Sequence, residues 1–257
     1  MPDDILLRQD QGPIATLTLN APATLNALSS AMLSRLDDEL TSLAASSQRV
    51  VILRATGKAF SAGHDLKQLQ ALRDEPDQGR DDFAALFALC AQVMQRITQL
   101  PQPVIAQVHA IAAAAGCQLV ASCDMVVAAD NARFGINGVN IGLYYHTPLV
   151  ALSQKIPRAR ALELASTGAF LTATEAQDAG LVTRVAAPDQ LAAETLALAS
   201  TLARKLPSAL AAGKRAAAPD LTALYQTATQ AMVANLMNPD TAEGIAAFLE
   251  KRPPHWA

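Results

Sequence analysis

The segment "PVIAQVHAIAAAAGCQLVASCDMVVAA", residues 103–129, contains the pattern that decides the fold. A buried-strand pattern over 103–110 runs through four consecutive alanines, 112–115, into a helical pattern, and a second strand pattern follows over 124–129. A strand that turns through small residues into a helix is a common location for an active site. The first polar side chain of this helix is the neutral amide of Gln118.

Strands and helices continue to alternate outward from this segment. Strand patterns occupy 15–20 and 49–56, and apolar residues recur at helical spacing over 29–43 and 83–97. The charged segment 70–82, with a proline and a glycine, is predicted to be a mobile surface loop. The glycine- and asparagine-rich segment 134–148 is predicted to be ordered but non-helical.

From about Thr172 onward, strand patterns become rare and helical patterns dominate. The sequence therefore predicts an α/β core over residues 1–190 and a C-terminal helical region over residues 191–257.

Composition excludes several classes of protein. The chain has 257 residues, 51% of them hydrophobic, which suffices for a large buried core. A net charge of -3 argues against a nucleic-acid-binding protein, which normally presents a basic face. Three cysteines without CxxC spacing indicate neither a disulfide framework nor a zinc site. The opening "MPDDILLRQDQG" lacks a basic segment followed by an apolar one, which predicts a cytoplasmic protein without a membrane segment.

Five blocks, taken together, resemble the enoyl-CoA hydratase/isomerase, or crotonase, family along nearly the whole chain. They are "TLNAPATLNALSSAML" (18–33), "GKAFSAGHDLKQ" (57–68), the opening segment 103–129, "RFGINGVNIGL" (133–143) and "EGIAAFLEKRPPHW" (243–256). The resemblance implies a crotonase-type spiral of ββα units with a C-terminal helical trimerisation region. It also implies a homotrimer or dimer of trimers, acyl-CoA substrates, and no cofactor beyond the coenzyme A that the substrate carries.

Chemistry next to a thioester carbonyl passes through an enolate, whose oxygen two backbone N–H groups can stabilise. Removing one such donor typically costs about 10²–10³ in rate. The resemblance assigns the two donors to Ala62 in "FSAGHDL" and Ala115 in "AAGCQL". Ala115 lies at the start of the predicted helix, where unpaired N–H groups and the helix dipole favour an anion.

Two glutamates supply proton transfer in hydratases of the family, and this chain lacks both. Gln118 and Gly138 occupy the corresponding positions. An amide does not exchange a proton at neutral pH and glycine has no side chain, whereas positioned proton transfer is worth about 10²–10⁴ in rate. The sequence therefore predicts weak or atypical hydratase activity.

Other residues near these positions are candidate substitutes. His64 either titrates near neutrality as a base or is a loop histidine beside the coenzyme A. His146 and Tyr144, just beyond Gly138, either take part in catalysis or form the wall of the acyl pocket. Asp65 is interpreted as a helix cap, and His109 as a packed residue at a strand end.

The resemblance also implies a binding channel for coenzyme A. Leu25, Ala27 and the run 62–65, which comprises Ala62, Gly63, His64 and Asp65, line the pantetheine and adenine channel. Phe248 and Lys251 correspond to residues that reach the nucleotide from a neighbouring subunit. This assignment links coenzyme A binding to oligomer assembly.

Three hypotheses for function remain open. The chain is a lyase or isomerase acting on acyl-CoA, or a non-catalytic protein that binds and sequesters acyl-CoA, or an RNA-binding protein built on this fold. The acidic balance disfavours the third. The glutamine in "AAGCQLVASCD" most resembles a subgroup described as enoyl-CoA hydratase-domain-containing proteins.

Overall fold

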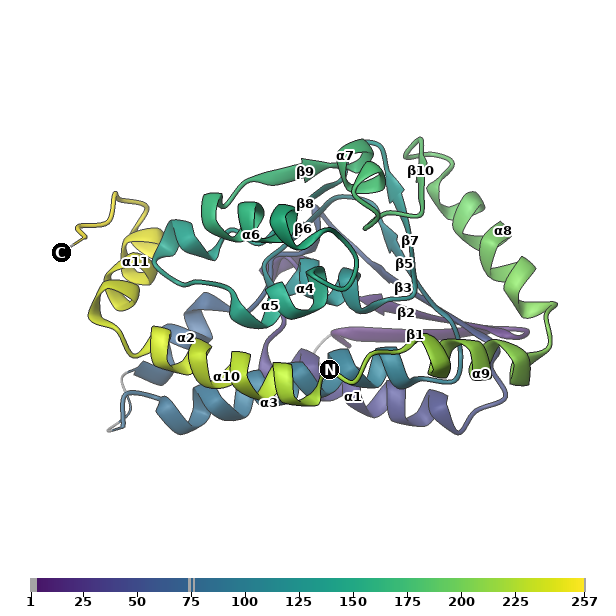
Figure 1. Ribbon diagram of the computed structural model, residues 1–257, viewed down its shortest axis with the longest axis horizontal. Helices are drawn as coiled ribbons and strands as arrows, with labels where there is room; N and C mark the ends of the chain where they lie inside the picture. The colour runs from purple at the N-terminus through teal and green to yellow at the C-terminus, as the bar shows by residue number, and fades with distance from the viewer. Residues whose placement is uncertain (1–3, 74, 76, 257) are drawn as a thin grey trace.

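The computed structural model describes residues 4–73, 75 and 77–256, and its strands form two sheets (Figure 1). The six-stranded sheet has the order β1-β2-β3-β5-β7-β10 and the four-stranded sheet the order β4-β6-β8-β9. The strands are β1 (Leu6–Gln11), β2 (Ile14–Leu19), β3 (Val50–Ala55), β4 (Ala59–Ser61), β5 (Val104–Val108), β6 (Ile111–Ala113), β7 (Met125–Ala129), β8 (Arg133–Gly135), β9 (Phe170–Thr172) and β10 (Arg184–Ala186).

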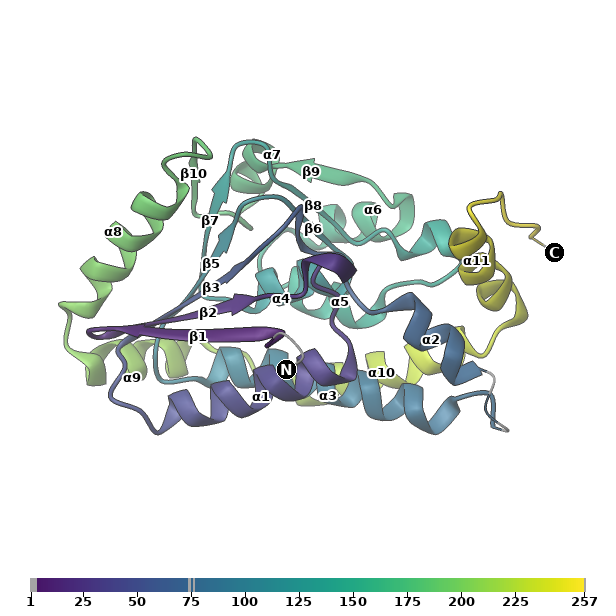
Figure 2. The same cartoon turned by 180° about the vertical axis from the view of Figure 1, so that it is seen from behind.

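Successive strand pairs explain why there are two sheets. β3, β5 and β7 lie in the large sheet, and the strand that follows each of them, β4, β6 or β8, lies in the small one. Pairing is parallel throughout, except for the β1–β2 hairpin, visible in Figure 2, and the β8–β9 pair. A helix follows most of these strand pairs, so the chain climbs as a spiral of ββα turns. The predicted fold class is confirmed.

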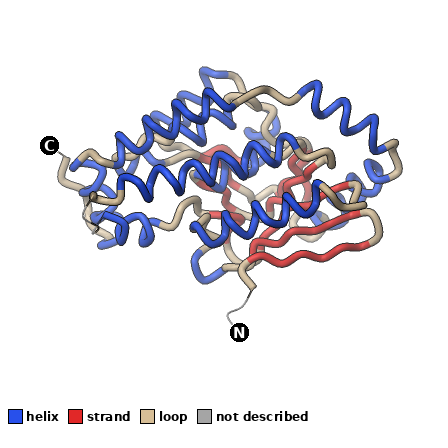
Figure 3. Tube along the Cα trace, turned by 90° about the horizontal axis from the view of Figure 1, so that it is seen from below, coloured by secondary structure: helices blue, strands red, loops and turns tan. Residues whose placement is uncertain are grey.

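Helices enclose this spiral. They are α1 (Ser30–Ala44), α2 (Leu66–Arg73), α3 (Arg80–Gln99), α4 (Ala115–Ser122), α5 (His146–Leu152), α6 (Arg158–Thr167), α7 (Ala173–Asp178), α8 (Leu191–Ala203), α9 (Pro207–Ala217), α10 (Thr222–Leu236) and α11 (Pro239–Glu250), with short 3-10 helices η1 (Pro22–Thr24) and η2 (Gly138–Ile141). α3 packs against both α1 and α10, and Figure 3 shows long helices lying side by side with the strands behind them. Within the described residues, no helix is both long and apolar enough to cross a membrane.

The helices after residue 190 contact the α/β core at several separate places. α8 covers one face of the large sheet, where Leu198 and Ala199 pack with Ile52 and Ile105. α10 packs on α3 and α5, and α11 packs on α2 and η2. Folding of the C-terminal helices is therefore coupled to burial of the core.

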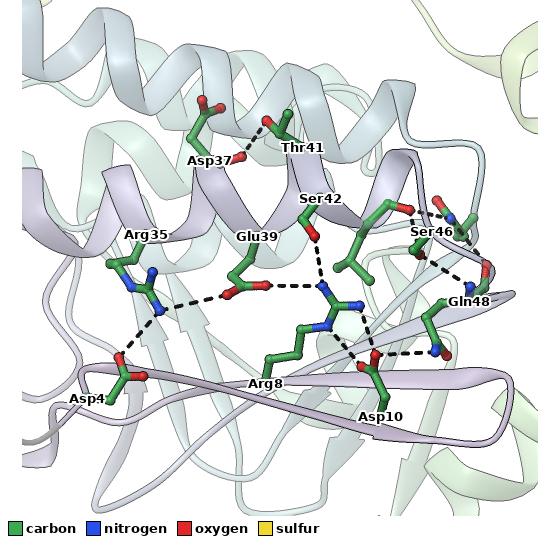
Figure 4. A network of polar contacts seen from close by, with 12 residues as sticks. Asp4, Arg8, Asp10, Arg35, Asp37, Glu39, Thr41, Ser42, Ser46 and Gln48 are labelled. Atoms are coloured by element: carbon green, nitrogen blue, oxygen red, sulfur yellow. Dashed lines mark hydrogen bonds and ion pairs between the residues drawn. The ribbon is translucent and has the colours of Figure 1, made fainter.

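A network of ion pairs joins β1 to α1 at the surface (Figure 4). The Arg8 guanidinium donates to Asp10 at 2.8 and 2.9 Å and to Glu39 at 3.3 Å, and Arg35 completes the chain to Asp4. Exposed pairs of this kind contribute about 0–1 kcal/mol each. The network orients the hairpin rather than holding the fold together.

Most elements lie where the sequence predicts them, and two segments differ. The segment 134–148 is partly helical, because η2 and the start of α5 fall within it. The predicted loop 70–82 is shorter than expected, since α2 continues to Arg73 and α3 begins at Arg80; residues 74 and 76 lie outside the described residues. Leu69 anchors α2 in the core, which favours the longer helix over the local charge pattern.

Candidate functional site

Two glycines bring the segments around Ser61 and Ala115 into contact. Gly63 has a φ of +93°, and a β-carbon there would lie 2.5 Å from Ala114 Cβ and 3.1 Å from Ala115 N. A β-carbon on Gly116 would lie 2.7 Å from Ser61 Cβ. Both positions therefore require glycine. The resulting close approach places the loop after β4 directly against the N-terminus of α4.

Asn26 fixes a third segment beside these two. Its side chain is fully buried, accepts a hydrogen bond from the Ala21 N–H at 2.8 Å, and donates to the carbonyls of Thr56 and Ala59 at 2.7 and 2.9 Å. Its carbonyl accepts from the Ser61 hydroxyl at 2.8 Å. The loop from 21 to 28 is consequently a rigid wall of the site.

The turn into α4 is strained, and this strain orients the Ala115 N–H. Ala114 caps the helix with φ 55° and ψ −127°, a conformation that suits glycine far better than alanine. The positive φ falls on Ala114 and not on Ala115, whose N–H begins the helix. Within the described residues no acceptor pairs with the Ala115 N–H, as is normal in the first turn of a helix.

The other predicted donor, the Ala62 N–H, is not free. It donates to the Leu25 carbonyl at 3.0 Å, and the Gly63 N–H is paired with the Ser61 hydroxyl at 3.3 Å. The next N–H along the chain, that of His64, has no partner in the part of the chain that the structure describes. Gly63, whose α-carbon faces Ala115 N, is the residue that directly precedes it. The free pair of N–H groups therefore belongs to His64 and Ala115.

The imidazole of His64 turns away from solvent. Its Nδ1 lies 3.1 Å from the Leu28 carbonyl, so Nδ1 carries the proton, and its ring meets Phe87 edge-on at 5.1 Å. Burial lowers the pKa of His64 to about 4, and the hydrogen bond to Leu28 only partly opposes this shift. A histidine that titrates near neutrality is thus the wrong interpretation. Its Nε2 is a buried acceptor without a partner in the described structure.

Gln118 is fully buried one turn into α4, and its amide lies close to the buried Tyr225 hydroxyl on α10, without a well-formed hydrogen bond among the described residues. Burial raises the pKa of Tyr225, and hydrogen-bonding interactions with the Gln118 and Ser122 side chains partly oppose this shift. No local sequence pattern indicates that Tyr225 lies beside Gln118, because the position of Tyr225 depends on how α10 packs against the core.

Gly138 offers no room for a side chain. A β-carbon there would overlap the Leu143 carbonyl and the ring of Tyr145, which is 8% exposed. The position lacks a carboxylate because an aromatic ring fills the space. The sequence places Tyr145 near this position, beside Tyr144 and His146, but the overlap of its ring with the space at Gly138 is visible only in the structure.

The segment that carries Tyr145 is held by the C-terminal helices. Asn235 on α10 accepts from the Tyr144 N–H at 2.7 Å, and the Thr241 hydroxyl on α11 donates to the Gly142 carbonyl at 2.8 Å. His146 begins α5, is half-buried, and lies 5.2 Å from the Tyr144 ring; burial lowers its pKa. Tyr144 and His146 therefore contact each other rather than Gln118 in the contacts that the structure records.

The residues predicted to bind coenzyme A lie in two regions, the segments around Asn26 and the start of α2, and the C-terminal end of α11. Leu25, with φ 53° and 44% exposed, and Ala27 lie on the wall fixed by Asn26. Asp65 accepts from the Lys67 N–H at 2.9 Å, which confirms it as the cap of α2. Phe248 is 59% exposed on α11, and Lys251 ends that helix with φ 58°. His109 Nε2 lies 2.9 Å from the Gly57 carbonyl, within hydrogen-bonding distance.

A cleft of about 580 Å³ lies elsewhere, between α9 and the end of α4. Its charged lining includes Lys155, which donates to the Asp124 carbonyl at 3.3 Å, and Lys214, which pairs with the Asp124 carboxylate at 2.6 Å and donates to the carbonyls of Ile97 and Gln102 at 2.9 Å. Lys214 therefore attaches α9 to the core.

Known proteins of similar sequence and structure identify the family to which this fold belongs. The profile of the family described as enoyl-CoA hydratase/isomerase matches residues 9–257. The mitochondrial enoyl-CoA hydratase domain-containing protein 3 of Mus musculus is 44% identical over 97% of this chain and 83% of that protein. The 2,3-dehydroadipyl-CoA hydratase of Escherichia coli is 36% identical over 99% of this chain and 98% of that protein. A crystal structure of an enoyl-CoA hydratase from Mycobacterium smegmatis has a TM-score of 0.80 at 46% identity, with 99% of each chain covered.

These relatives also correct one prediction. Several are named as mitochondrial proteins, which contradicts the cytoplasmic location predicted from the first twelve residues. That prediction rested on local composition, whereas the compartment is not a property that the folded domain encodes. The match over residues 9–257 and the identities above show that the chain belongs to the enoyl-CoA hydratase/isomerase family.

Proposed function

We propose that the protein binds acyl-CoA thioesters and polarises the thioester carbonyl between the N–H groups of His64 and Ala115. The observation that carries this proposal is that these two unpaired donors adjoin each other across Gly63. The helix dipole of α4 adds to their field at Ala115. Coenzyme A enters as part of the substrate, along Leu25, Ala27 and the 62–65 run.

The proposed site has few groups that could transfer a proton to or from the substrate. Gln118 replaces one carboxylate, Gly138 has no room for the other, and His64 stays neutral at physiological pH because its pKa is about 4. An intact pair of donors without an acid or base supports enolate stabilisation but little hydration. The second candidate, binding of acyl-CoA without turnover, rests on the same absence of a carboxylate.

Residues 191–257 are proposed to serve in oligomerisation as well as in building the core. α9 has no buried residue, and Leu206, Leu224 and Phe248 are 67%, 52% and 59% exposed. Apolar surface of this kind favours association. We expect a homotrimer or a dimer of trimers, in which Phe248 and Lys251 reach a neighbouring nucleotide. A monomer in light scattering at micromolar concentration would exclude this assembly.

The function is tested by titration calorimetry with acetyl-CoA and crotonyl-CoA, with free coenzyme A as the reference, beside an assay of crotonyl-CoA hydration. The proposal expects both thioesters to bind more tightly than free coenzyme A, and hydration about 10²–10⁴ slower than in an enzyme that has both glutamates. A folded protein that binds neither thioester would exclude the proposal. Hydration at the full rate would exclude the account of Gln118 and Gly138.

A further inference from the structure

The cleft between α9 and the end of α4 is separate from the proposed thioester site. Ser122 and Asp124 line one side of it, and residues of α9 line another. The proposed donor Ala115 begins α4 and Ser122 ends that helix, so the rise of the helix separates the two sites by roughly 10 Å. At about 580 Å³, the cleft has the size of a typical small-molecule site. A ligand in this cleft would therefore not occupy the thioester site.

Gly213 keeps the cleft open from the side of α9. Glycine in the interior of a helix is less stable than alanine, so such a glycine usually meets a steric need. Gly116 and Gly244 have that need, because a β-carbon on either would overlap the carbonyl oxygen of Ser61 or Ile141. A β-carbon on Gly213 would meet nothing within 4 Å among the described residues. Packing within the described chain therefore does not require this glycine, and its effect is to leave the cleft wide.

The charges that line the cleft do not balance. Its charged residues in the described lining are Asp124, Lys155 and Lys214. The Asp124 carboxylate pairs with Lys214 at 2.6 Å and accepts a hydrogen bond from the Val104 N–H at 2.7 Å. Lys155 donates only to the Asp124 carbonyl, at 3.3 Å, and has no carboxylate partner in the part of the chain that the structure describes. The cleft therefore carries one positive charge in excess.

The two ammonium groups lie close enough to influence each other. Burial lowers the pKa of Lys214, Asp124 opposes this shift, and Lys155 adds to the lowering. An anion beside the two lysines relieves such repulsion. A carboxylate suits this position, because each of its oxygens accepts hydrogen bonds and charge-assisted hydrogen bonds to an ammonium group are strong.

The remaining lining is mostly aliphatic. Ala121 on α4, Ala151 on α5 and Leu210 on α9 contribute to it, and none of the described lining residues is aromatic. The hydroxyls of Thr98 and Ser122 donate to backbone carbonyls at 2.8 Å, so their protons are already used. A hydrocarbon chain buries apolar area against such walls and needs neither a stacking surface nor a further hydrogen-bond donor.

We infer that this cleft is a second binding site, for an aliphatic monocarboxylate, with the carboxylate held by Lys155 and Lys214 and the hydrocarbon chain lying along α9. The inference goes beyond the proposed function and does not depend on it. The bound carboxylate joins the segment after α5 to α9, so binding stabilises the folded chain.

The test uses octanoate as the probe, with octanol and acetate as references, in titration calorimetry on the full chain. The wild type is expected to bind octanoate at least about tenfold more tightly than octanol, because only the carboxylate pairs with the ammonium groups. It should bind octanoate at least about a hundredfold more tightly than acetate, which lacks the chain. Saturating octanoate should raise the melting temperature and leave crotonyl-CoA affinity unchanged.

Two substitutions separate the charge from the space. Lys155→Met should lower octanoate affinity to that of octanol, and Lys155→Arg should retain the preference. Lys205→Met is the matched control, since Lys205 is exposed and does not line the cleft, and it should change neither affinity. Gly213→Leu fills the cleft without a steric conflict at its β-carbon. It should abolish binding of octanoate and octanol, keep or raise the melting temperature, and leave crotonyl-CoA affinity unchanged.

Three results would overturn the inference. The first is octanoate that does not bind the wild type, or that binds equally well to Lys155→Met or Gly213→Leu. The second is competition between octanoate and crotonyl-CoA, which would locate the carboxylate at the thioester site. The third is loss of an oligomer in Gly213→Leu, seen by light scattering, which would show that a second copy of the chain fills the cleft. A folded protein that binds octanoate in this way but binds no thioester would support the inference and exclude the proposed function.

Discussion

Gly63 lies against the peptide that joins Ala114 to Ala115, so closely that a β-carbon on Gly63 would be 2.5 Å from Ala114 Cβ. This contact sets the spacing between the two free N–H groups of the proposed site. It also explains why a strained alanine is tolerated at 114: both sides of the turn are confined by packing, and the surrounding structure determines a conformation that the local chain disfavours.

Gly63→Ala is therefore expected to lower both stability and thioester affinity. Positive-φ strain and overpacking each cost about 1–3 kcal/mol, so the free energy of unfolding should fall by at least about 2 kcal/mol. Denaturant unfolding measures this loss. Gly12→Ala is the matched control: Gly12 also has a positive φ, of +56°, but a β-carbon there meets nothing within 4 Å. An equal loss in the two variants would show that the Ala114 contact is unimportant.

Asn26→Ala should be one of the most destabilising single substitutions in the chain. It leaves the Ala21 N–H and the carbonyls of Thr56 and Ala59 without their partner in a fully buried position. At about 1–3 kcal/mol for each unsatisfied group, a loss of at least about 3 kcal/mol is expected. Asn20→Ala, which removes an exposed hydrogen bond to the Asp4 carbonyl and one from the Thr56 hydroxyl, should cost less in the same unfolding experiment, because Asn20 is not buried.

His64 should make stability depend on pH on the acid side of neutrality. Its folded pKa, about 4, lies below its ordinary value of 6.5, so the unfolded chain takes up a proton first as the pH falls. Stability is then expected to decrease between pH 6.5 and 4 by roughly 2 kcal/mol, less than the full shift implies because part of the residue is exposed.

His64→Asn keeps a donor for the Leu28 carbonyl and should remove this pH dependence, as followed by unfolding at a series of pH values. His109→Asn, at a histidine bonded to the Gly57 carbonyl, should retain it. A wild-type protein whose stability is constant over this range would contradict the buried, neutral state of His64.

Restoring the two carboxylates is expected to fail for a structural reason. In Gln118→Glu the buried carboxyl has a raised pKa, so the variant should lose stability relative to the wild type as the pH rises above about 4. Gly138→Glu meets a backbone carbonyl and the Tyr145 ring and should lower the free energy of unfolding by about 3 kcal/mol or more. Thermal melts and crotonyl-CoA hydration assays report both effects; a stable double variant that gains hydratase activity would refute this steric account.

The strands and helices of the core were predictable because period-two and helical patterns specify them locally. The crossing of the two sheets, and with it the contact between Gly63 and Ala115, became predictable only through the family resemblance. The free N–H of His64 was not predicted, and the Ala62 N–H was named in its place. The Ala62 N–H is paired because the Leu25 carbonyl points toward it, and the direction of that carbonyl depends on the folded loop rather than on a local sequence pattern. The closure of the second glutamate position by Tyr145 likewise depends on a ring contact that no local pattern encodes.

The most direct test of the central claim is a carbon-13 NMR spectrum of crotonyl-CoA, labelled at the thioester carbonyl, in the presence of excess protein. Two N–H donors at His64 and Ala115 should polarise the carbonyl, so the account predicts a downfield shift of its resonance with little conversion to the hydrated product. The same shift should be weakened in Gly63→Ala, which displaces Ala115 from His64. A carbonyl resonance that stays at its free position under saturating protein, or rapid and complete conversion to 3-hydroxybutyryl-CoA, would contradict the account.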